Sequence, residues 1–395
     1  MRIGILTQPL LANYGGLLQN HALQQVLLRN GHEVETIDHG APASFSLHRW
    51  LYHAKKDLAH LLLPGRFSEH YRPTAEEQAV IRQHTDRFIA NYLRRTAVCR
   101  SSEDFRQVAA ERQYDAFVVG SDQCWRPCYN VFLEDMFLQF ASDMPAIRRI
   151  AYAASFGTDV WELSPQQTHI CAALAKKFDC ITVREASAVG LCQSNLGVKA
   201  TLVLDPTMLL DKDDYEALID KECEPASPGT LFEYILDPTH TKSDFIQRIA
   251  DQNSLTPFKV LPRHQREVMT KRNVRNDIEG CVYPSVTSWL RAFKDARMVV
   301  VDSFHGAVFS IIFNKPFWVI ANAERGNARF DSLLKLFHLE DRLLSAAKLS
   351  AVEQNAPIDW QSVNNIRQQE KQRSLNLLLS ALNVNTILTH RKHHT

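Results

Sequence analysis

His305 is the residue of this sequence best placed to transfer a proton. It follows the three valines 299–301, a run typical of a buried strand, and a helix-like stretch begins directly after Asp302-Ser303. A histidine in that first turn lies at the carboxyl edge of a parallel sheet, where α/β proteins bind ligands, and a helix start offers N–H groups to phosphate or carboxylate. A histidine that only packs under a capped turn fits the same residues, so both interpretations stay open.

Other predicted strands also end in small, polar or charged residues. These strand ends are Asn13-Tyr14-Gly15-Gly16, Gly120-Ser121-Asp122-Gln123, Ser155-Phe156-Gly157, Arg184-Glu185 and Asp205-Pro206. Each is weak evidence alone, because helix caps and tight turns need the same residue types. Carboxyl ends of parallel strands share one edge of a sheet, so together with His305 they indicate a common ligand site.

The elements that must position these residues alternate between strand and helix patterns. Strands are expected at 2–7, 33–37, 116–119, 149–154, 180–183, 200–204, 231–236, 258–262, 298–301 and 317–320. Helices are expected at 17–30, 74–95, 165–176, 186–193, 241–253, 285–294, 306–313 and 361–382. This order predicts the α/β class, with two doubly wound domains facing across a cleft.

The expected domain limits follow from a charged stretch rich in proline and glycine. We predict an N-terminal domain over 1–210, a linker over 211–229, a C-terminal domain over 230–350, and a last helix with a disordered tail over 351–395. At 395 residues the chain is too long for one comfortable core, which agrees with two domains.

Composition excludes several function classes. The net charge of +1 gives no field for nucleic acid. The eight cysteines are scattered, and the pair Cys124 and Cys128 has no second pair to complete a metal site. Free thiols fit a reducing cytoplasm, the N-terminus lacks a signal-peptide pattern, and no apolar run reaches the roughly 18 residues that span a bilayer. We therefore expect a cytoplasmic protein.

Six stretches in combination resemble the polysaccharide pyruvyl transferase family. They are NYGGLLQNHALQ (13–24), VVGSDQCWRP (118–127), YAASFG (152–157), ITVREASA (181–188), LDPTMLL (204–210) and the run 283–317 containing SFHG. They occur in the family's order over residues 1 to about 340. The departures are small: Cys124 replaces a usual aliphatic residue, and Val301 stands where threonine is frequent.

The resemblance implies two Rossmann-like domains arranged as in B-type glycosyltransferases. It also implies transfer of pyruvate from phosphoenolpyruvate to two sugar hydroxyls, which gives a cyclic ketal and free phosphate. Phosphoenolpyruvate would be the co-substrate, with no other cofactor and no metal. On matching positions, the resemblance makes His305 and Arg184 the pair that handles phosphoenolpyruvate.

The residue types on this donor side suit an anion. Arg184 offers a planar fork for carboxylate or phosphate, although an ion pair with Glu185 or another carboxylate is the alternative. His305 is expected to act as general acid and to contact phosphate, with Ser303 and the N–H groups near Gly306 in support. Arg329 is a second expected anion contact, and an ordinary surface arginine is its alternative.

On the acceptor side, Asp122 is expected to act as base or to accept a sugar hydroxyl, with a helix cap as the alternative. Asn13 and Gln19 are expected to bind the sugar by hydrogen bonds, and Tyr14 to stack on it. The remaining predicted acceptor residues are Gly15, Gly16, Ser121 and Gln123. The two glycines would permit close backbone approach, but a plain turn explains them too.

Two other functions fit the same architecture: a nucleotide-sugar-dependent glycosyltransferase and a non-catalytic glycan-binding descendant. The acceptor is expected to be a glycan or a lipid-linked oligosaccharide. An apolar stripe at 47–63 predicts either packing on its own domain or docking on an anionic membrane, which would place the protein at the inner face of the membrane.

Overall fold

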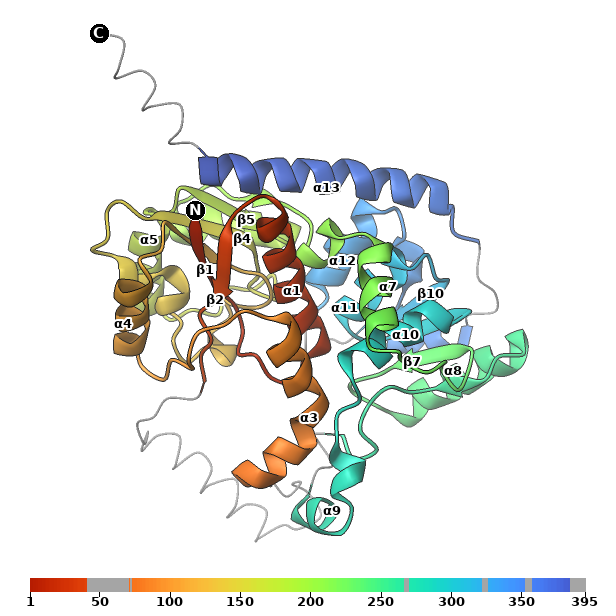
Figure 1. Cartoon of the computed structure of the whole chain (residues 1–395). Coiled ribbons are helices and arrows are strands. Elements are labelled where there is room, and N and C mark those ends of the chain that lie inside the picture. Colours follow the sequence, from red (N-terminus) through yellow and green to blue (C-terminus); the bar gives the residue numbers. More distant parts are fainter. Residues whose placement is uncertain (41–70, 72, 266–269, 322–325, 352–356, 384–395) are drawn as a thin grey trace.

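The computed structural model describes residues 1–40, 71, 73–265, 270–321, 326–351 and 357–383. They form two parallel sheets flanked by helices (Figure 1). The first sheet has the order β2-β1-β3-β4-β5-β6, and the second β11-β10-β9-β7-β8. The expected α/β class with two Rossmann-like domains is confirmed.

The first sheet is buried on both faces. Its strands are β1 (Arg2–Leu6), β2 (Glu33–Thr36), β3 (Ala116–Val119), β4 (Arg148–Ala154), β5 (Cys180–Val183) and β6 (Thr201–Leu202). Side chains alternate along each strand: Ala116 and Val118 face one apolar cluster, while Phe117 and Val119 face another. Burial on both faces explains why β3 reads as a continuous apolar run.

The second sheet repeats this design. Its strands are β7 (Leu231–Tyr234), β8 (Pro257–Phe258), β9 (Met298–Val301), β10 (Phe317–Ile320) and β11 (Leu343–Leu344). In the first sheet β2 lies on one side of β1 and β3 lies on the other, and in the second sheet β8 and β9 flank β7 in the same way. The chain therefore reverses direction between β1 and β3 and again between β7 and β9, and such switch points are where doubly wound sheets bind ligands.

The helices of the described chain cover both sheets. They are α1 (Tyr14–Arg29), α3 (Ala75–Tyr92), α4 (Ser102–Arg112), α5 (Pro165–Ala175), α6 (Ala186–Leu191), α7 (Lys212–Lys221), α8 (His240–Asn253), α9 (Lys271–Asn276), α10 (Val286–Asp295), α11 (Phe304–Ile312), α12 (Ala328–Leu336) and α13 (Trp360–Asn383). In the described ranges no helix is long and apolar enough to cross a membrane.

Two helices begin earlier than the periodicity predicts, and both carry residues of interest. Helix α1 begins at Tyr14 rather than 17, because the Asn13 side chain caps it by accepting a hydrogen bond from the Gly16 N–H. Helix α11 begins at Phe304 rather than 306, since Ser303 caps it in the same way. Apolar spacing misses such first turns because capping, not burial, defines them.

Other differences concern edges and connections. Strands β6 and β8 each have two residues where five were expected, and helices α4 and α12 were not predicted. The expected linker contains α7, which packs against α10. The domain limits themselves stay predictions. The stripe 47–63 and the tail 384–395 lie outside the described residues.

Helix α13, the expected last helix, crosses back to the first domain (Figure 1). The Ser374 hydroxyl accepts a hydrogen bond from the Leu204 N–H at 3.1 Å, and Arg373 Nη2 donates to the Leu202 carbonyl at 2.7 Å. These contacts fix the segment just after β6, which carries Asp205.

Candidate active site

Arg184 lies at the centre of a buried charge network at the carboxyl edge of the first sheet. It follows β5, and its side chain is 0% exposed. Its Nη2 donates to Asp122 Oδ1 at 2.8 Å, and its Nη1 donates to Asp205 Oδ2 at 2.9 Å. Arg184 therefore forms ion pairs, the alternative to anion binding, and its partners are Asp122 and Asp205 rather than Glu185. Both ends of the fork are occupied, so contact of Arg184 with phosphoenolpyruvate stays a prediction.

Asp122 follows β3 at the switch point of the first sheet. Its backbone is left-handed, with φ of 68°, and its side chain is almost completely buried. Burial acts to raise the pKa of Asp122, but the charges of Arg184, His305 and Arg329 outweigh it and the pKa is lowered. Asp122 is therefore a carboxylate at neutral pH. Asn13 Nδ2 reaches its Oδ2 at 3.4 Å, across the switch point.

His305 comes from the switch point of the second sheet and points into the network of the first. Its Nε2 lies 3.5 Å from Asp205 Oδ2. Its ring also lies against Gly15 in the first turn of α1, where an added Cβ would lie 2.1 Å from Nδ1. His305 and Arg184 are thus brought together across the domain boundary.

Asp205, which the sequence analysis noted as a strand end and within the motif LDPTMLL, joins these residues. Burial acts to raise the pKa of Asp205, but His305 and Arg184 lower it well below the usual range. The motif LDPTMLL contains Asp205, but it gave this residue no role, because an Asp-Pro pair after a strand reads as a cap. Asp205 does cap the short helix at Pro206–Leu209, through its other oxygen.

Arg329, in the first turn of α12, is a buried cation. It is 8% exposed, and its buried Nε has no hydrogen-bond partner. Within the described ranges it makes no ion pair. Burial, with help from Arg184, lowers the pKa of Arg329 to about 10. The surface-arginine alternative is therefore wrong.

Phe304 lies beside both guanidinium groups. The Arg184 Cζ is 4.6 Å and the Arg329 Cζ 5.8 Å from its ring centroid. Cation–π attraction stabilises each cation by about 1–2 kcal/mol at buried sites. It does not replace a counter-ion, so the site keeps a cation without a carboxylate of its own.

Glu185 also sits in this region without contacting Arg184's fork. Its Oε1 accepts hydrogen bonds from the N–H groups of Phe156 and Gly157 and from the Ser155 hydroxyl. Burial raises its pKa. Glu185 thus holds the loop after β4, which approaches the second domain where Gly157 meets Gly326.

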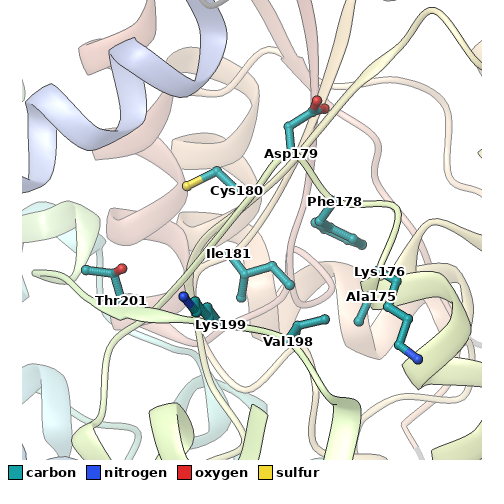
Figure 2. Close-up of a pocket in the computed structure, with 9 residues that line it drawn as sticks. All are labelled: Ala175, Lys176, Phe178, Asp179, Cys180, Ile181, Val198, Lys199 and Thr201. Atoms are coloured by element: carbon teal, nitrogen blue, oxygen red, sulfur yellow. The ribbon is translucent and has the colours of Figure 1, made fainter. Parts of the chain in front are cut away.

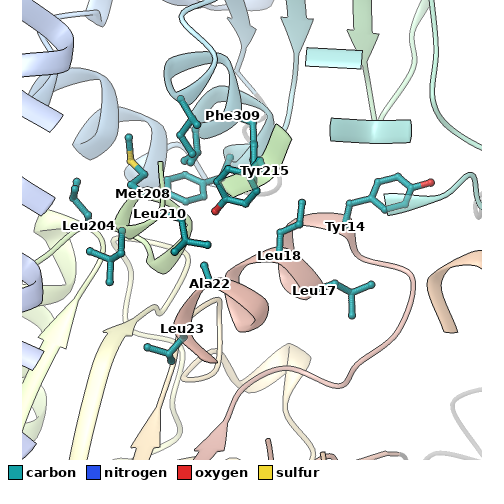
Figure 3. Packing of buried hydrophobic residues seen from close by; sticks show 14 of the residues in the cluster. Tyr14, Leu17, Leu18, Ala22, Leu23, Leu204, Met208, Leu210, Tyr215 and Phe309 are labelled. Atoms are coloured by element: carbon teal, nitrogen blue, oxygen red, sulfur yellow. The ribbon is translucent and has the colours of Figure 1, made fainter. Parts of the chain in front are cut away.

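Tyr14, expected to stack on a sugar, lies elsewhere. It is 1% exposed, its hydroxyl donates to the Pro284 carbonyl at 3.0 Å, and its ring contacts Trp289 and Tyr234. Figure 3 shows it with α1 residues in an apolar cluster that includes Phe309 of the second domain and Tyr215 of the connection. The stacking prediction for Tyr14 is therefore wrong in this structure: apolar packing between the domains covers the ring.

Other predicted acceptor residues take supporting positions. Gln19 Oε1 accepts a hydrogen bond from the Ser121 N–H, and its Nε2 donates to Thr7. Ser121 Oγ lies 3.1 Å from Asp205 Oδ2. Gly16 packs beside Asn13 and lies in the first turn of α1. These contacts hold the site together, and direct sugar contacts of these residues stay predictions.

Ser303 and Gly306 are joined by a hydrogen bond in the first turn of α11. Ser303 Oγ accepts a hydrogen bond from the Gly306 N–H at 3.0 Å, so that N–H already has a partner. Space is tight at Gly306, where a Cβ would lie 2.7 Å from Val301. The pair shapes the turn that presents His305, and their contact with phosphate stays a prediction.

Tyr129 is an exposed aromatic residue near Arg329 that the sequence analysis did not single out. It is 48% exposed on the loop after Asp122, and its phenol contributes to the electrostatics of Arg329. Arg126 Cζ lies 5.3 Å from its ring centroid, while Arg126 makes two hydrogen bonds to Glu162, at 2.9 and 3.0 Å. Gln123 Oε1 accepts a third hydrogen bond from Arg126 at 3.1 Å. An aromatic residue shortly after a strand-end carboxylate was the available signal.

A surface hollow of about 430 Å³ lies away from this network (Figure 2). Its lining includes Asp179 and Cys180 at the start of β5 and Thr201 at the start of β6. Arg184 follows the opposite end of β5, so the hollow is at the amino edge of the sheet. We assign the site to the charge network, because buried cations and carboxylates from both domains meet there and not in the hollow.

The comparison with protein families agrees with the motifs. The family model described as polysaccharide pyruvyl transferase matches residues 13–324, which include every residue of the network except Arg329. The chain belongs to the polysaccharide pyruvyl transferase family. This family assignment confirms the resemblance and identifies the chain as a transferase acting on polysaccharides. No curated protein sequence matches the chain significantly.

Solved structures match over nearly the whole chain at low identity. A putative UDP-N-acetylglucosamine 2-epimerase from Listeria monocytogenes is 10% identical with a TM-score of 0.48, and the match covers 100% of this chain and 97% of that one. UDP-N-acetylglucosamine 2-epimerase from Rickettsia bellii is 10% identical with a TM-score of 0.48, and the match covers 97% of each chain. A glycosyltransferase from Rickettsia africae is 8% identical with a TM-score of 0.43, and the match covers 99% of this chain and 97% of that one. Likenesses this distant carry no argument about function.

Proposed function

We propose that this protein transfers pyruvate from phosphoenolpyruvate to two hydroxyls of a sugar in a polysaccharide or its lipid-linked precursor. The observation that carries the proposal is the buried guanidinium of Arg329, which makes no ion pair with any described residue and lies beside Phe304 together with Arg184. An unpaired buried cation is costly unless a ligand supplies the counter-charge. Phosphoenolpyruvate, with a carboxylate and a phosphate, is such a ligand.

The reaction makes and breaks bonds at one carbon. The first hydroxyl oxygen bonds to the central carbon of phosphoenolpyruvate while the methylene carbon gains a proton. The second hydroxyl oxygen then bonds to the same carbon as its bond to the phosphate oxygen breaks. The two hydroxyls lose one proton each: one is balanced by the new methyl group, and the other leaves with phosphate.

The site's residues suit separate parts of this chemistry. His305 is the group that moves a proton, because imidazole both donates and accepts protons near neutral pH. Asp122 has a lowered pKa and holds a proton weakly, so its role is to orient a sugar hydroxyl by accepting its hydrogen bond. Arg329 binds the anion. Arg184 fixes the two carboxylates, and only its Nε is left without a partner.

On the acceptor side we assign stacking to Tyr129 in place of Tyr14. Its ring is exposed beside the site, and Arg126, with its hydrogen bonds to Glu162 and Gln123, backs the ring. Aromatic rings held in this way pack against the C–H faces of sugars with little loss of conformational entropy. A lipid-linked acceptor and docking on the inner face of a membrane belong to the same proposal, which nothing in the described residues tests.

The test combines binding and turnover. The protein is incubated with phosphoenolpyruvate and a panel of methyl hexopyranosides, and phosphate release is measured together with the mass increase of the sugar. Phosphoenolpyruvate is expected to raise the melting temperature, and uridine diphosphate is expected to leave it unchanged. Stabilisation by uridine diphosphate alone would favour a nucleotide-sugar glycosyltransferase and reject the proposal. Binding of sugar without phosphoenolpyruvate turnover would indicate a glycan-binding descendant.

A further inference from the structure

The two carboxylate oxygens of Asp205 have separate partners. Oδ1 accepts hydrogen bonds from the Thr207 N–H at 3.0 Å and the Thr207 hydroxyl at 2.8 Å. Oδ2 faces the domain boundary, 2.9 Å from Arg184 Nη1, 3.1 Å from Ser121 Oγ and 3.5 Å from His305 Nε2. Oδ1 therefore fixes the orientation of the Asp205 side chain, and Oδ2 is free to contact Arg184 and His305.

We propose that Asp205 is the positioning residue that assembles the catalytic site across the two domains. Oδ2 is shared by Arg184, from the first domain, and by His305, from the second. This inference rests on the proposed function, and it adds a residue to which neither the motifs nor the resemblance gives a role.

Burial makes this shared carboxylate effective. The side chains of Asp205 and Arg184 are 0% exposed, and that of His305 is 10% exposed. Water screens charges of this kind weakly, so the orientation of the imidazole depends on the charges around it. These charges are Asp205 after β6, Asp122 after β3, Arg184 after β5 and Arg329 on α12.

Among the described residues, Asp205 is the one carboxylate within ion-pair distance of both the guanidinium of Arg184 and the imidazole of His305. Asp122 contacts the guanidinium on its other side, and no ion pair joins it to His305. Oδ1 is anchored on the segment that α13 holds through Leu204. Asp205 is therefore held in place by contacts that do not involve His305.

A capping role alone would predict different behaviour from a positioning role. Asparagine is as good a helix cap as aspartate, so Asp205→Asn preserves the bonds at Oδ1. The substitution replaces Oδ2 by an amide that is neutral and, in the orientation that keeps the cap, presents N–H donors to Arg184. The capping role predicts a folded protein with unchanged chemistry, whereas the positioning role predicts a displaced imidazole.

The experiment compares Asp205→Asn with the matched control Asp277→Asn, because Asp277 also caps a short helix, at Ile278–Cys281, and also pairs with an arginine and a histidine, but lies away from the site. The ring nitrogens of His305 are followed by long-range 1H–15N NMR, and His305→Gln identifies their signals. In Asp205→Asn we expect these signals to move and kcat to fall on the order of 100-fold, with KM for phosphoenolpyruvate changing far less. The control is expected to leave both unchanged.

Unmoved His305 signals in a folded Asp205→Asn protein would overturn the inference, whatever happens to kcat. If that variant does not fold, Thr207→Val decides, because it keeps the carboxylate charge and removes one bond that fixes Oδ1. Its His305 signals are expected to broaden or move, and unchanged signals would again overturn the inference. If the wild type never turns over phosphoenolpyruvate, the proposed function fails, while the NMR result still decides the role of Asp205.

Discussion

The imidazole of His305 lies directly against Gly15, although the two residues belong to different domains. A Cβ at position 15 would be 2.1 Å from Nδ1 and 2.6 Å from the Cβ of His305. Only glycine leaves this space inside the first turn of a helix. Gly15, which the sequence presents as part of a turn, thus makes room for the imidazole of His305.

We predict that Gly15→Ala displaces His305 and lowers turnover on the order of 100-fold. Alanine improves helix propensity by about 1 kcal/mol, but overpacking costs about 1–3 kcal/mol, so stability should also fall slightly. Turnover and thermal unfolding are measured beside Gly190→Ala. Nothing lies within 4 Å of a Cβ at Gly190, so that control should be stabilised and fully active. A fully active Gly15→Ala would contradict the contact.

Arg329→Met is predicted to make the protein more stable and unable to bind phosphoenolpyruvate. The substitution removes a buried cation without an ion-pair partner in the described chain and keeps apolar volume. Thermal unfolding is measured with and without phosphoenolpyruvate, which should raise the melting temperature of the wild type only. Arg29→Met, which removes an exposed ion pair with Asp214, is the control and should retain the ligand-induced shift. An equal ligand shift in Arg329→Met would reject the anion site.

Tyr129→Ala is predicted to raise KM for the pyranoside acceptor roughly fivefold, because loss of the ring removes about 1 kcal/mol of packing against the sugar. KM for phosphoenolpyruvate should not change. Steady-state kinetics with the acceptor varied check this, and Tyr129→Phe, which keeps the ring, should behave like the wild type. Equal loss in the phenylalanine variant would assign the effect to the hydroxyl instead.

We predict that protonation of the buried His21 lowers the free energy of unfolding in mild acid. Burial between Phe88 and Tyr92 lowers the pKa of His21 from 6.5 to about 4, although a bond to the Tyr92 carbonyl opposes the shift. The folded state prefers the neutral ring, so its stabilisation is complete above pH 6.5 and is lost as the pH falls towards 4. Between pH 7.5 and 5 the loss is about 2 kcal/mol.

Urea unfolding at pH 7.5 and pH 5 measures this loss. His21→Phe keeps an aromatic ring against Phe88 and cannot titrate, so the difference between the two pH values should shrink by about 2 kcal/mol. The same pH dependence in both proteins would show that His21 is not the group responsible.

Much of the architecture was readable in the sequence because burial leaves a periodic trace. The runs at β3 and β9 are apolar throughout since both faces of each sheet are covered, and the residue after each run marks the carboxyl edge. The position of His305 at that edge follows from this pattern. First turns such as those at Tyr14 and Phe304 left no such trace, because side-chain caps define them.

The sequence by itself determined the two α/β domains, the family, and the set of strand ends from which a site would be built. Only the tertiary structure decided how these residues pair. Ion pairing depends on distances across the domain boundary, which no local pattern encodes. It occupies Arg184 with Asp122 and Asp205, gives Arg329 no ion pair among the described residues, and buries Tyr14 while exposing Tyr129. Burial strengthens these ion pairs, because charges removed from water act on one another strongly.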